Sequence, residues 1–183
     1  LPGQLRNARS LHLLLHLVES LLELARLDDG GLDAAPKLLD LSALVSDAVL
    51  PFEPVYFERG LELACRIEAG VRGSAARLRQ LADILLDNAA KYAAPHSQVT
   101  VTLARRGGRG LLSVSSAGAP IPAEELESIF LRFYRADKAR RRDGSFGLGL
   151  SIAREIVQAH RGRIWAESGD GRNVFHAELP APR

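Results

Sequence analysis

Two segments of the sequence carry polar or glycine residues at spacings that suit phosphate chemistry. Within residues 80–92, Asn88, Lys91 and Tyr92 lie three and four positions apart, so a helix places them on one face. Asn88 offers a carbonyl oxygen and Lys91 a mobile positive charge, which together suit a magnesium ion and the phosphates that it bridges. Asparagine is unfavourable inside a helix, which favours function, but a solvated helix face remains the alternative.

The second segment is the glycine-rich stretch of residues 144–150, directly before an amphipathic helical pattern with Ile152 and Ile156. Glycines at a helix start let the backbone approach a ligand, and the free N–H groups there favour an anion. The segment lacks the Gly-Lys-Ser/Thr of a P-loop, and Ile152 occupies the third glycine position of a dinucleotide fingerprint. A phosphate site and a flexible hinge both remain open for it. A third stretch, residues 114–122, ends a strand in a Gly/Pro turn and indicates only a loop.

The elements that must position these residues are read from hydrophobic periodicity. Helical patterns cover residues 74–92, 122–130 and 148–160, and another follows the N-cap candidate Ser42. Strand patterns cover residues 61–67, 98–105, 110–116, 163–167 and 174–179, and a polar loop covers residues 135–145. The last two strands and the 98–116 pair look like hairpins. This mixture predicts a two-layer α/β sandwich with a mixed sheet rather than a doubly wound parallel sheet.

Residues 11–27 form a long, leucine-rich amphipathic helical pattern at the start of the chain. Charged residues and histidines interrupt it too often for a membrane span, so we expect no membrane contact by this chain. Apolar residues occupy more than one side, so the helix needs partners on more than one side. It either packs on its own domain or forms a helical-bundle interface between two copies, and we favour the dimer.

Composition excludes several classes of protein. The 183 residues are enough for one domain and an appendage, and 46% hydrophobic and 25% charged residues are typical of a globular protein. The single cysteine, Cys65, excludes an internal disulfide framework and fits a reducing compartment. A net charge of +2 gives no reason to expect nucleic acid as a partner. Because the chain starts at Leu1 and contains no methionine, we expect it to be a piece of a longer protein.

Taken in order, the motifs resemble the ATP-binding domain of bacterial sensor histidine kinases, a fold shared with gyrase, Hsp90 and MutL. Residues 80–92 look like the N box, 116–122 the first glycine box, 130–135 the F box and 147–150 the second glycine box. Residues 171–175 and 178–180 are similar to the closing segment. The resemblance implies a Bergerat-type two-layer α/β sandwich, a mixed sheet under helices, preceded by a long amphipathic helix. It divides the chain into residues 1–31, part of the second helix of a dimerisation hairpin, and residues 37–183, the ATP-binding domain.

The resemblance also implies a site for ATP and Mg²⁺. Asn88 matches the magnesium-binding asparagine of the family, and Lys91 and Tyr92 match residues that hold the phosphates. The loop from Arg135 to Phe146, with four cationic side chains, matches a mobile lid over the phosphates. The full set of expected ATP-contacting residues is Asn88, Lys91, Tyr92, Ser116, Gly118, Ile121, Phe133, Tyr134, Arg135, Gly147, Leu148, Gly149 and Leu150.

Three positions depart from the family pattern. Ile84 stands where a second asparagine is usual, so fewer protein groups are available for magnesium. The same position holds the general-base glutamate of the ATP-hydrolysing relatives, so Ile84 argues against a gyrase-like ATPase. Ser116 replaces the acidic or amide residue that accepts a hydrogen bond from the adenine amino group, which costs about tenfold in affinity if charge assistance is lost. Pro120 replaces a glycine.

The phosphoacceptor histidine of the family has no match in this chain. His12 and His16 are followed by apolar residues instead of the family's acidic and basic ones, so we expect the acceptor upstream of Leu1. The implied function is the catalytic part of a two-component sensor histidine kinase, which passes the ATP γ-phosphoryl to a histidine outside this chain and onward to a response regulator receiver domain. With this function we expect a homodimer formed through the N-terminal helix. We also expect a cytoplasmic location for this chain, within a parent protein that a membrane segment can anchor. The alternative is a degenerate nucleotide-binding or regulatory dimerisation module without kinase activity.

Overall fold

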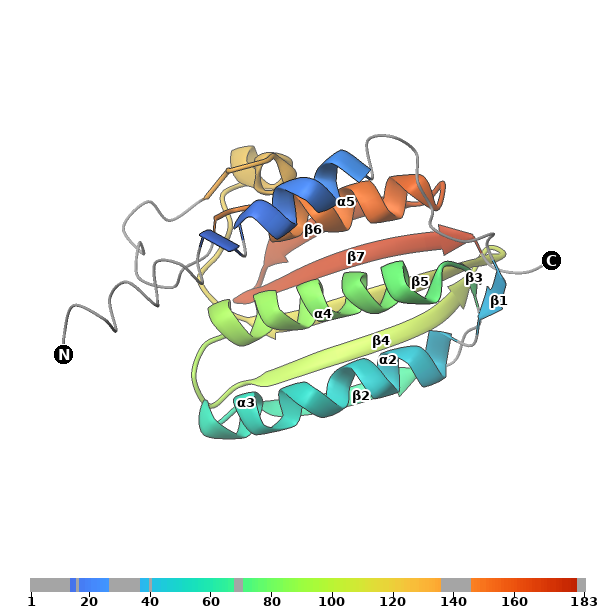
Figure 1. Ribbon diagram of the computed structural model, residues 1–183. Helices are drawn as coiled ribbons and strands as arrows, with labels where there is room; N and C mark the ends of the chain where they lie inside the picture. The colour runs from blue at the N-terminus through green and yellow to red at the C-terminus, as the bar shows by residue number, and fades with distance from the viewer. Residues whose placement is uncertain are drawn as a thin grey trace, which may run out of the picture.

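The main sheet of the molecule has five strands. The structure is a computed structural model that describes residues 14–15, 17–26, 37–39, 41–67, 71–135 and 146–180. The strands lie in the order β2-β4-β5-β7-β6 (Figure 1). Strand β2 runs parallel to β4, and every other neighbouring pair is antiparallel, so the predicted mixed sheet is present. The strands are β2 (Glu62–Ile67), β4 (Gln98–Arg106), β5 (Arg109–Ala117), β6 (Arg163–Gly169) and β7 (Arg172–Pro180).

Helices cover one face of this sheet, and the core lies between the two layers (Figure 1). The covering helices are α2 (Leu41–Val49), α3 (Glu53–Glu58), α4 (Ala75–Tyr92) and α5 (Gly149–Ala159), and the short 3-10 helix η1 (Leu50–Phe52) joins α2 to α3. Alternation along β4 buries Val99, Val101 and Leu103 against the helices. The 3.6-residue period of α4 directs Leu81 and Leu85 into the same core. The two periodicities thus predicted the two layers correctly.

Two local features differ from the sequence-based expectation. Residues 122–130 were predicted to form one short helix, but they form two 3-10 helices, η2 (Ala123–Glu125) and η3 (Ser128–Phe130). The second of these buries the side chains of Ile129 and Phe130. A two-stranded antiparallel sheet of β1 (Lys37–Leu39) and β3 (Val71–Gly73) was not predicted, because three residues are too few to show alternation.

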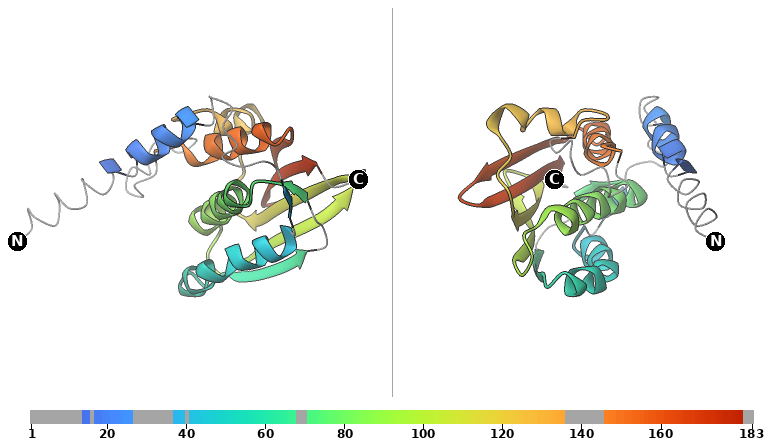
Figure 2. Two further views of the ribbon diagram at one scale, coloured as in Figure 1. Left: turned by 45° about the vertical axis from the view of Figure 1, so that its right-hand side comes forward. Right: turned by 90° about the vertical axis from the view of Figure 1, so that its left-hand side faces the viewer.

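The N-terminal helical segment, residues 14–15 and 17–26, lies outside the helix layer on the side away from the sheet (Figure 2). One side of it packs onto the domain, where Leu24 and Ser20 are buried. The other side is apolar and exposed at Leu14, Leu15, Val18, Leu21 and Leu22. Packing on its own domain, one of the two alternatives left open by the sequence, is therefore confirmed for one side of the helix, and the dimer interface stays a prediction. Both His12 and His16 lie outside the described residues, as does the predicted start of this helix.

Among the described residues, no helix combines the length and the apolar character needed to cross a membrane.

Candidate functional site

A cavity of about 1190 Å³ opens between α4, the start of α5 and the end of β5. Twelve of the thirteen residues predicted to contact a nucleotide line it: Asn88, Lys91, Tyr92, Ser116, Gly118, Ile121, Tyr134, Arg135, Gly147, Leu148, Gly149 and Leu150. Phe133 does not line the cavity, and its side chain is 58% exposed. Four motifs that are separate in the sequence therefore meet around one space.

Helix α4 supplies the polar wall of the cavity. Its last two turns place Asn88 and Lys91 on the cavity side, as the three-residue spacing predicted. The ammonium group of Lys91 lies 2.6 Å from a carboxylate oxygen of Asp87, four residues earlier on the same helix. This ion pair is half exposed, so it orients the lysine without holding it strongly. Ile84, one turn before Asn88, also lines the cavity and presents only an apolar side chain.

The start of α5 supplies backbone N–H groups. Gly147 has φ +71°, a left-handed conformation that favours glycine, and a Cβ there would lie 2.5 Å from the carbonyl oxygen of Tyr134. The carbonyl of Gly147 accepts a 3.0 Å hydrogen bond from the backbone N–H of Phe133. Phe133 thus braces the glycine turn from outside the cavity. The first turn of α5, beginning at Gly149, then presents unpaired N–H groups and the positive end of the helix dipole to an anion.

The inner face of the sheet forms the opposite wall. Ser116 on β5 pairs with Asn173 on β7, and both side chains are buried and line the cavity. The side-chain amide of Asn173 donates to the carbonyl of Ala119 at 2.9 Å, and its oxygen accepts from the Ser168 hydroxyl at 2.7 Å. The Ser168 hydroxyl in turn accepts from the backbone N–H of Ile121 at 2.9 Å. Asn173, which the sequence did not single out, therefore fastens the loop after β5 to the final hairpin.

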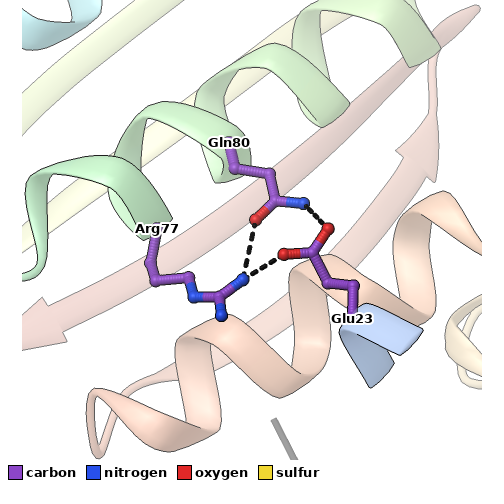
Figure 3. A network of polar contacts seen from close by, with 3 residues as sticks. All are labelled: Glu23, Arg77 and Gln80. Atoms are coloured by element: carbon purple, nitrogen blue, oxygen red, sulfur yellow. Dashed lines mark hydrogen bonds and ion pairs between the residues drawn. The ribbon is translucent and has the colours of Figure 1, made fainter. Parts of the chain in front are cut away.

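The N-terminal helical segment adds a further wall, and a polar cluster holds it in place (Figure 3). Glu23 on this segment accepts hydrogen bonds from the guanidinium of Arg77 and, at 2.6 Å, from the side-chain amide of Gln80. Arg77 also donates to the Gln80 side-chain oxygen at 3.4 Å. The Arg77 side chain is only 7% exposed, so its charge needs a carboxylate nearby. Sequence patterns gave no signal for this contact, because its partners are 54 and 57 residues apart.

The charged groups on the described walls are predominantly acidic. The carboxylates are Glu19, Glu23, Asp83, Asp87 and Glu125, and the cationic side chains are Arg59, Lys91 and Arg135. Loss of hydration and the nearby Glu125 carboxylate raise the pKa of Tyr134. A polyphosphate in this cavity therefore needs added positive charge. The predicted lid cations Lys138, Arg140, Arg141 and Arg142 lie outside the described residues.

The residues of the cavity fit a magnesium ion that arrives with a nucleotide rather than one held by the protein alone. In the described part of the chain, no group of three or more His, Cys, Asp or Glu side chains is placed to hold a metal. Asn88 supplies one amide oxygen, the kind of ligand that Mg²⁺ prefers, and Ile84 supplies none. Magnesium commonly keeps its waters and binds through one or two protein oxygens and the phosphates.

Known proteins resemble this chain in sequence. Residues 73–183 match the family model described as histidine kinase-, DNA gyrase B- and HSP90-like ATPase. The chain is 34% identical over 166 residues to the sensor protein DltS of Streptococcus agalactiae, covering 90% of this chain and 42% of DltS. It is 39% identical over 184 residues to the sensor histidine kinase TrcS of Mycobacterium tuberculosis, covering 90% of this chain and 33% of TrcS. The chain thus spans less than half the length of these curated relatives.

Solved structures show the same architecture. The catalytic domain of the histidine kinase ThkA superimposes with a TM-score of 0.72 at 26% identity, over 81% of this chain and 97% of that domain. ThkA in complex with the response regulator protein TrrA matches with a TM-score of 0.69 at 25% identity, over 80% of this chain and 42% of the ThkA chain. The predicted two-layer α/β sandwich is confirmed.

Proposed function

Because this chain belongs to the family of histidine kinase-, DNA gyrase B- and HSP90-like ATPases, we propose that it is the ATP-binding catalytic part of a two-component sensor histidine kinase. The observation that carries the proposal is the meeting of the Asn88–Lys91 face of α4 with the glycine turn of α5 on one cavity. The kinase names of the relatives do not favour the alternative of a regulatory module without activity. The division into residues 1–31 and 37–183 is part of the proposal.

The geometry assigns separate tasks to the parts of the cavity. The first turn of α5 and Lys91 hold the phosphates, because free N–H groups and an ammonium group both attract anions. The buried floor at Ser116 and Phe175 takes the base, because a planar aromatic ring packs favourably against an apolar surface. A magnesium ion bound with the nucleotide supplies charge neutralisation between phosphates, and Asn88 is the protein oxygen that would hold it.

The chemical step is a transfer between groups that the protein positions. The bond from the γ-phosphorus to the bridging oxygen of ADP breaks, and a bond from that phosphorus to an imidazole nitrogen forms. The imidazole belongs to a histidine outside this chain, and the phosphoryl group then passes to an aspartate of a response regulator receiver domain. Lys91 and the α5 N-terminus offset the charge of the phosphates during transfer. Position 84 carries an isoleucine, which cannot act as a general base to activate water, and this favours transfer over hydrolysis.

The partners follow from the same proposal. The exposed leucine face of the N-terminal segment is the side that would pack against a second copy in a four-helix arrangement. The ThkA structure with TrrA makes a response regulator the expected protein substrate of the assembled kinase. Both the nucleotide and such a regulator are found in the cytoplasm, where we place this part of the protein.

Titration with a fluorescent ATP analogue, with and without magnesium, tests the nucleotide site directly. Saturable binding that unlabelled ATP displaces supports the proposal, whereas no binding at millimolar nucleotide overturns it. A longer chain that includes the upstream helix tests the reaction. With labelled ATP it should acquire an acid-labile phosphoryl group, and an acid-stable label would indicate a serine or threonine acceptor instead.

A further inference from the structure

The cavity has two chemically different ends. One end carries Lys91 and the start of α5, which suit phosphates. The other end is the sheet floor, where Phe175 and Ile129 are buried and Phe130 packs edge-on against Phe175 with ring centroids 6.4 Å apart. On β5 and β7, the inward-facing positions beside these apolar residues are Ser116 and Asn173, directly paired across the strands. A base that lies on this floor therefore has Ser116 and Asn173 as its neighbouring polar side chains.

The two polar side chains of the floor differ in their freedom. The carboxamide of Asn173 is fixed in one orientation, because its nitrogen donates to Ala119 and its oxygen accepts from Ser168. Ser116 as a whole residue is only 6% exposed. Its hydroxyl has no hydrogen-bond partner among the described residues. A hydroxyl on a cavity wall without a protein partner leaves a hydrogen bond for a ligand to complete.

We propose that Ser116 contacts the purine base and that this cavity accepts guanine nucleotides about as well as adenine nucleotides; this rests on the proposed nucleotide site. Adenine presents an amino donor at its six position, where guanine presents a carbonyl acceptor. A serine hydroxyl both donates and accepts, and it rotates to suit either partner. Strong discrimination arises when the wrong ligand leaves a buried polar group unpaired. With Ser116, neither base leaves the hydroxyl unpaired.

Asn173 acts here as a positioning residue. It holds the loop between Gly118 and Ile121 against the final hairpin and so keeps the floor in place beneath the base. Its fixed orientation means that it does not reverse between donor and acceptor when the base changes. The selectivity of the cavity therefore depends on the one floor hydroxyl that turns.

Competition titrations with ATP and GTP against the same fluorescent nucleotide, in magnesium and on the 183-residue chain, test this inference. We expect the two dissociation constants to agree within about threefold. In Ser116→Asp, the carboxylate only accepts, so it favours the adenine amino group and repels the guanine carbonyl, and the ATP preference should rise to about tenfold or more. Ser116→Ala is the matched control, which should weaken both nucleotides by a similar factor.

The outcomes separate this inference from the function on which it rests. Binding of ATP with at least tenfold rejection of GTP by the natural sequence overturns the inference and leaves the kinase proposal standing. An unchanged ratio in a folded Ser116→Asp chain also overturns it. Failure of both nucleotides to displace the probe overturns the proposed function itself, and the inference with it. The comparison in the natural sequence stands even if Ser116→Asp does not fold.

Discussion

The ring of His160 accepts a 3.0 Å hydrogen bond from the backbone N–H of Ser74. This bond joins the C-terminal end of α5 to the residue before α4, although the two are 86 positions apart. The other ring nitrogen contacts the carbonyl of Ile156 at 2.7 Å, which assigns the proton to Nδ1 and leaves Nε2 as the acceptor. Both helices line the cavity, so a neutral histidine fixes their relative position at the far end from the phosphates.

This arrangement predicts a loss of stability in mild acid. Burial lowers the pKa of His160, and the positive charge of Arg77 acts in the same direction against the opposing Ile156 carbonyl. The unfolded chain therefore takes up the proton near pH 6.5 while the folded chain resists it, so the free energy of unfolding falls as the pH drops below about 6.5. Urea denaturation at pH 7.5 and pH 5.5 measures this. In His160→Ala the cost at pH 7.5 should be about 1–3 kcal/mol, because the buried N–H of Ser74 loses its acceptor.

His176 is a second histidine that contributes to the pH dependence measured in that experiment. Burial lowers its pKa as well, against the opposing carboxylate of Glu167, so it contributes acid sensitivity of the same sign. It lies on β7, with its Nδ1 2.8 Å from the Ser113 hydroxyl, and it does not line the cavity. The variant His176→Gln should lose part of the acid sensitivity without affecting nucleotide affinity. If His160→Ala shows the same pH slope as the natural sequence, the assignment to His160 is wrong.

Gly147→Ala should destabilise the protein and weaken nucleotide binding together. A side chain at φ +71° costs about 1–2 kcal/mol by itself, and here its Cβ also meets the Tyr134 carbonyl. Gly108 is the matched control, with φ +75° and nothing within 4 Å of a Cβ. Gly108→Ala should show only the smaller conformational cost in urea denaturation and unchanged affinity. Equal losses in the two variants would mean that the contact with Tyr134 is not what requires glycine.

The sequence predicted the motifs of the cavity well because each motif is local. Asn88 and Lys91 share a helical face by spacing alone, and Gly147 precedes a helix that periodicity reveals. Asn173 could not be found in this way, because its place beside Ser116 depends on the register between β5 and β7. The sequence shows the pattern of β7, but it does not show which strand β7 pairs with.

The contact between Glu23 and Arg77 was unpredictable for a related reason. Helical periodicity showed that the N-terminal segment is apolar on more than one side, and it could not say which side meets the domain. That choice depends on the buried Arg77 and the amide of Gln80, which lie on α4 and offer donors to a single carboxylate. From the sequence alone, a charged side chain in an amphipathic helix is predicted to be exposed to solvent, because its partner is not known.

Replacement of Glu23 should release the N-terminal segment from α4. Glu23→Ala removes the carboxylate that contacts Arg77 and Gln80, so the free energy of unfolding should fall by about 1–3 kcal/mol. Hydrogen exchange at residues 17–26 should quicken by more than exchange in β4. Glu19→Ala is the matched control, because Glu19 lies one turn earlier and has no ion pair among the described residues. Unchanged exchange in Glu23→Ala would show that the buried Leu24 alone docks the segment.

Asn88 determines how strongly the proposed nucleotide site should depend on magnesium. Because the described walls carry more carboxylates than cations, free ATP should bind much more weakly than its magnesium complex. Asn88→Ala removes the amide oxygen that we propose holds that ion, so the ratio of affinities with and without magnesium should fall towards one. Ile84→Asn adds a second oxygen one helical turn earlier, on the same face, and should increase the ratio. Titration of each folded variant with and without magnesium measures both changes, and a ratio that Asn88→Ala leaves unaltered would remove Asn88 as the ligand.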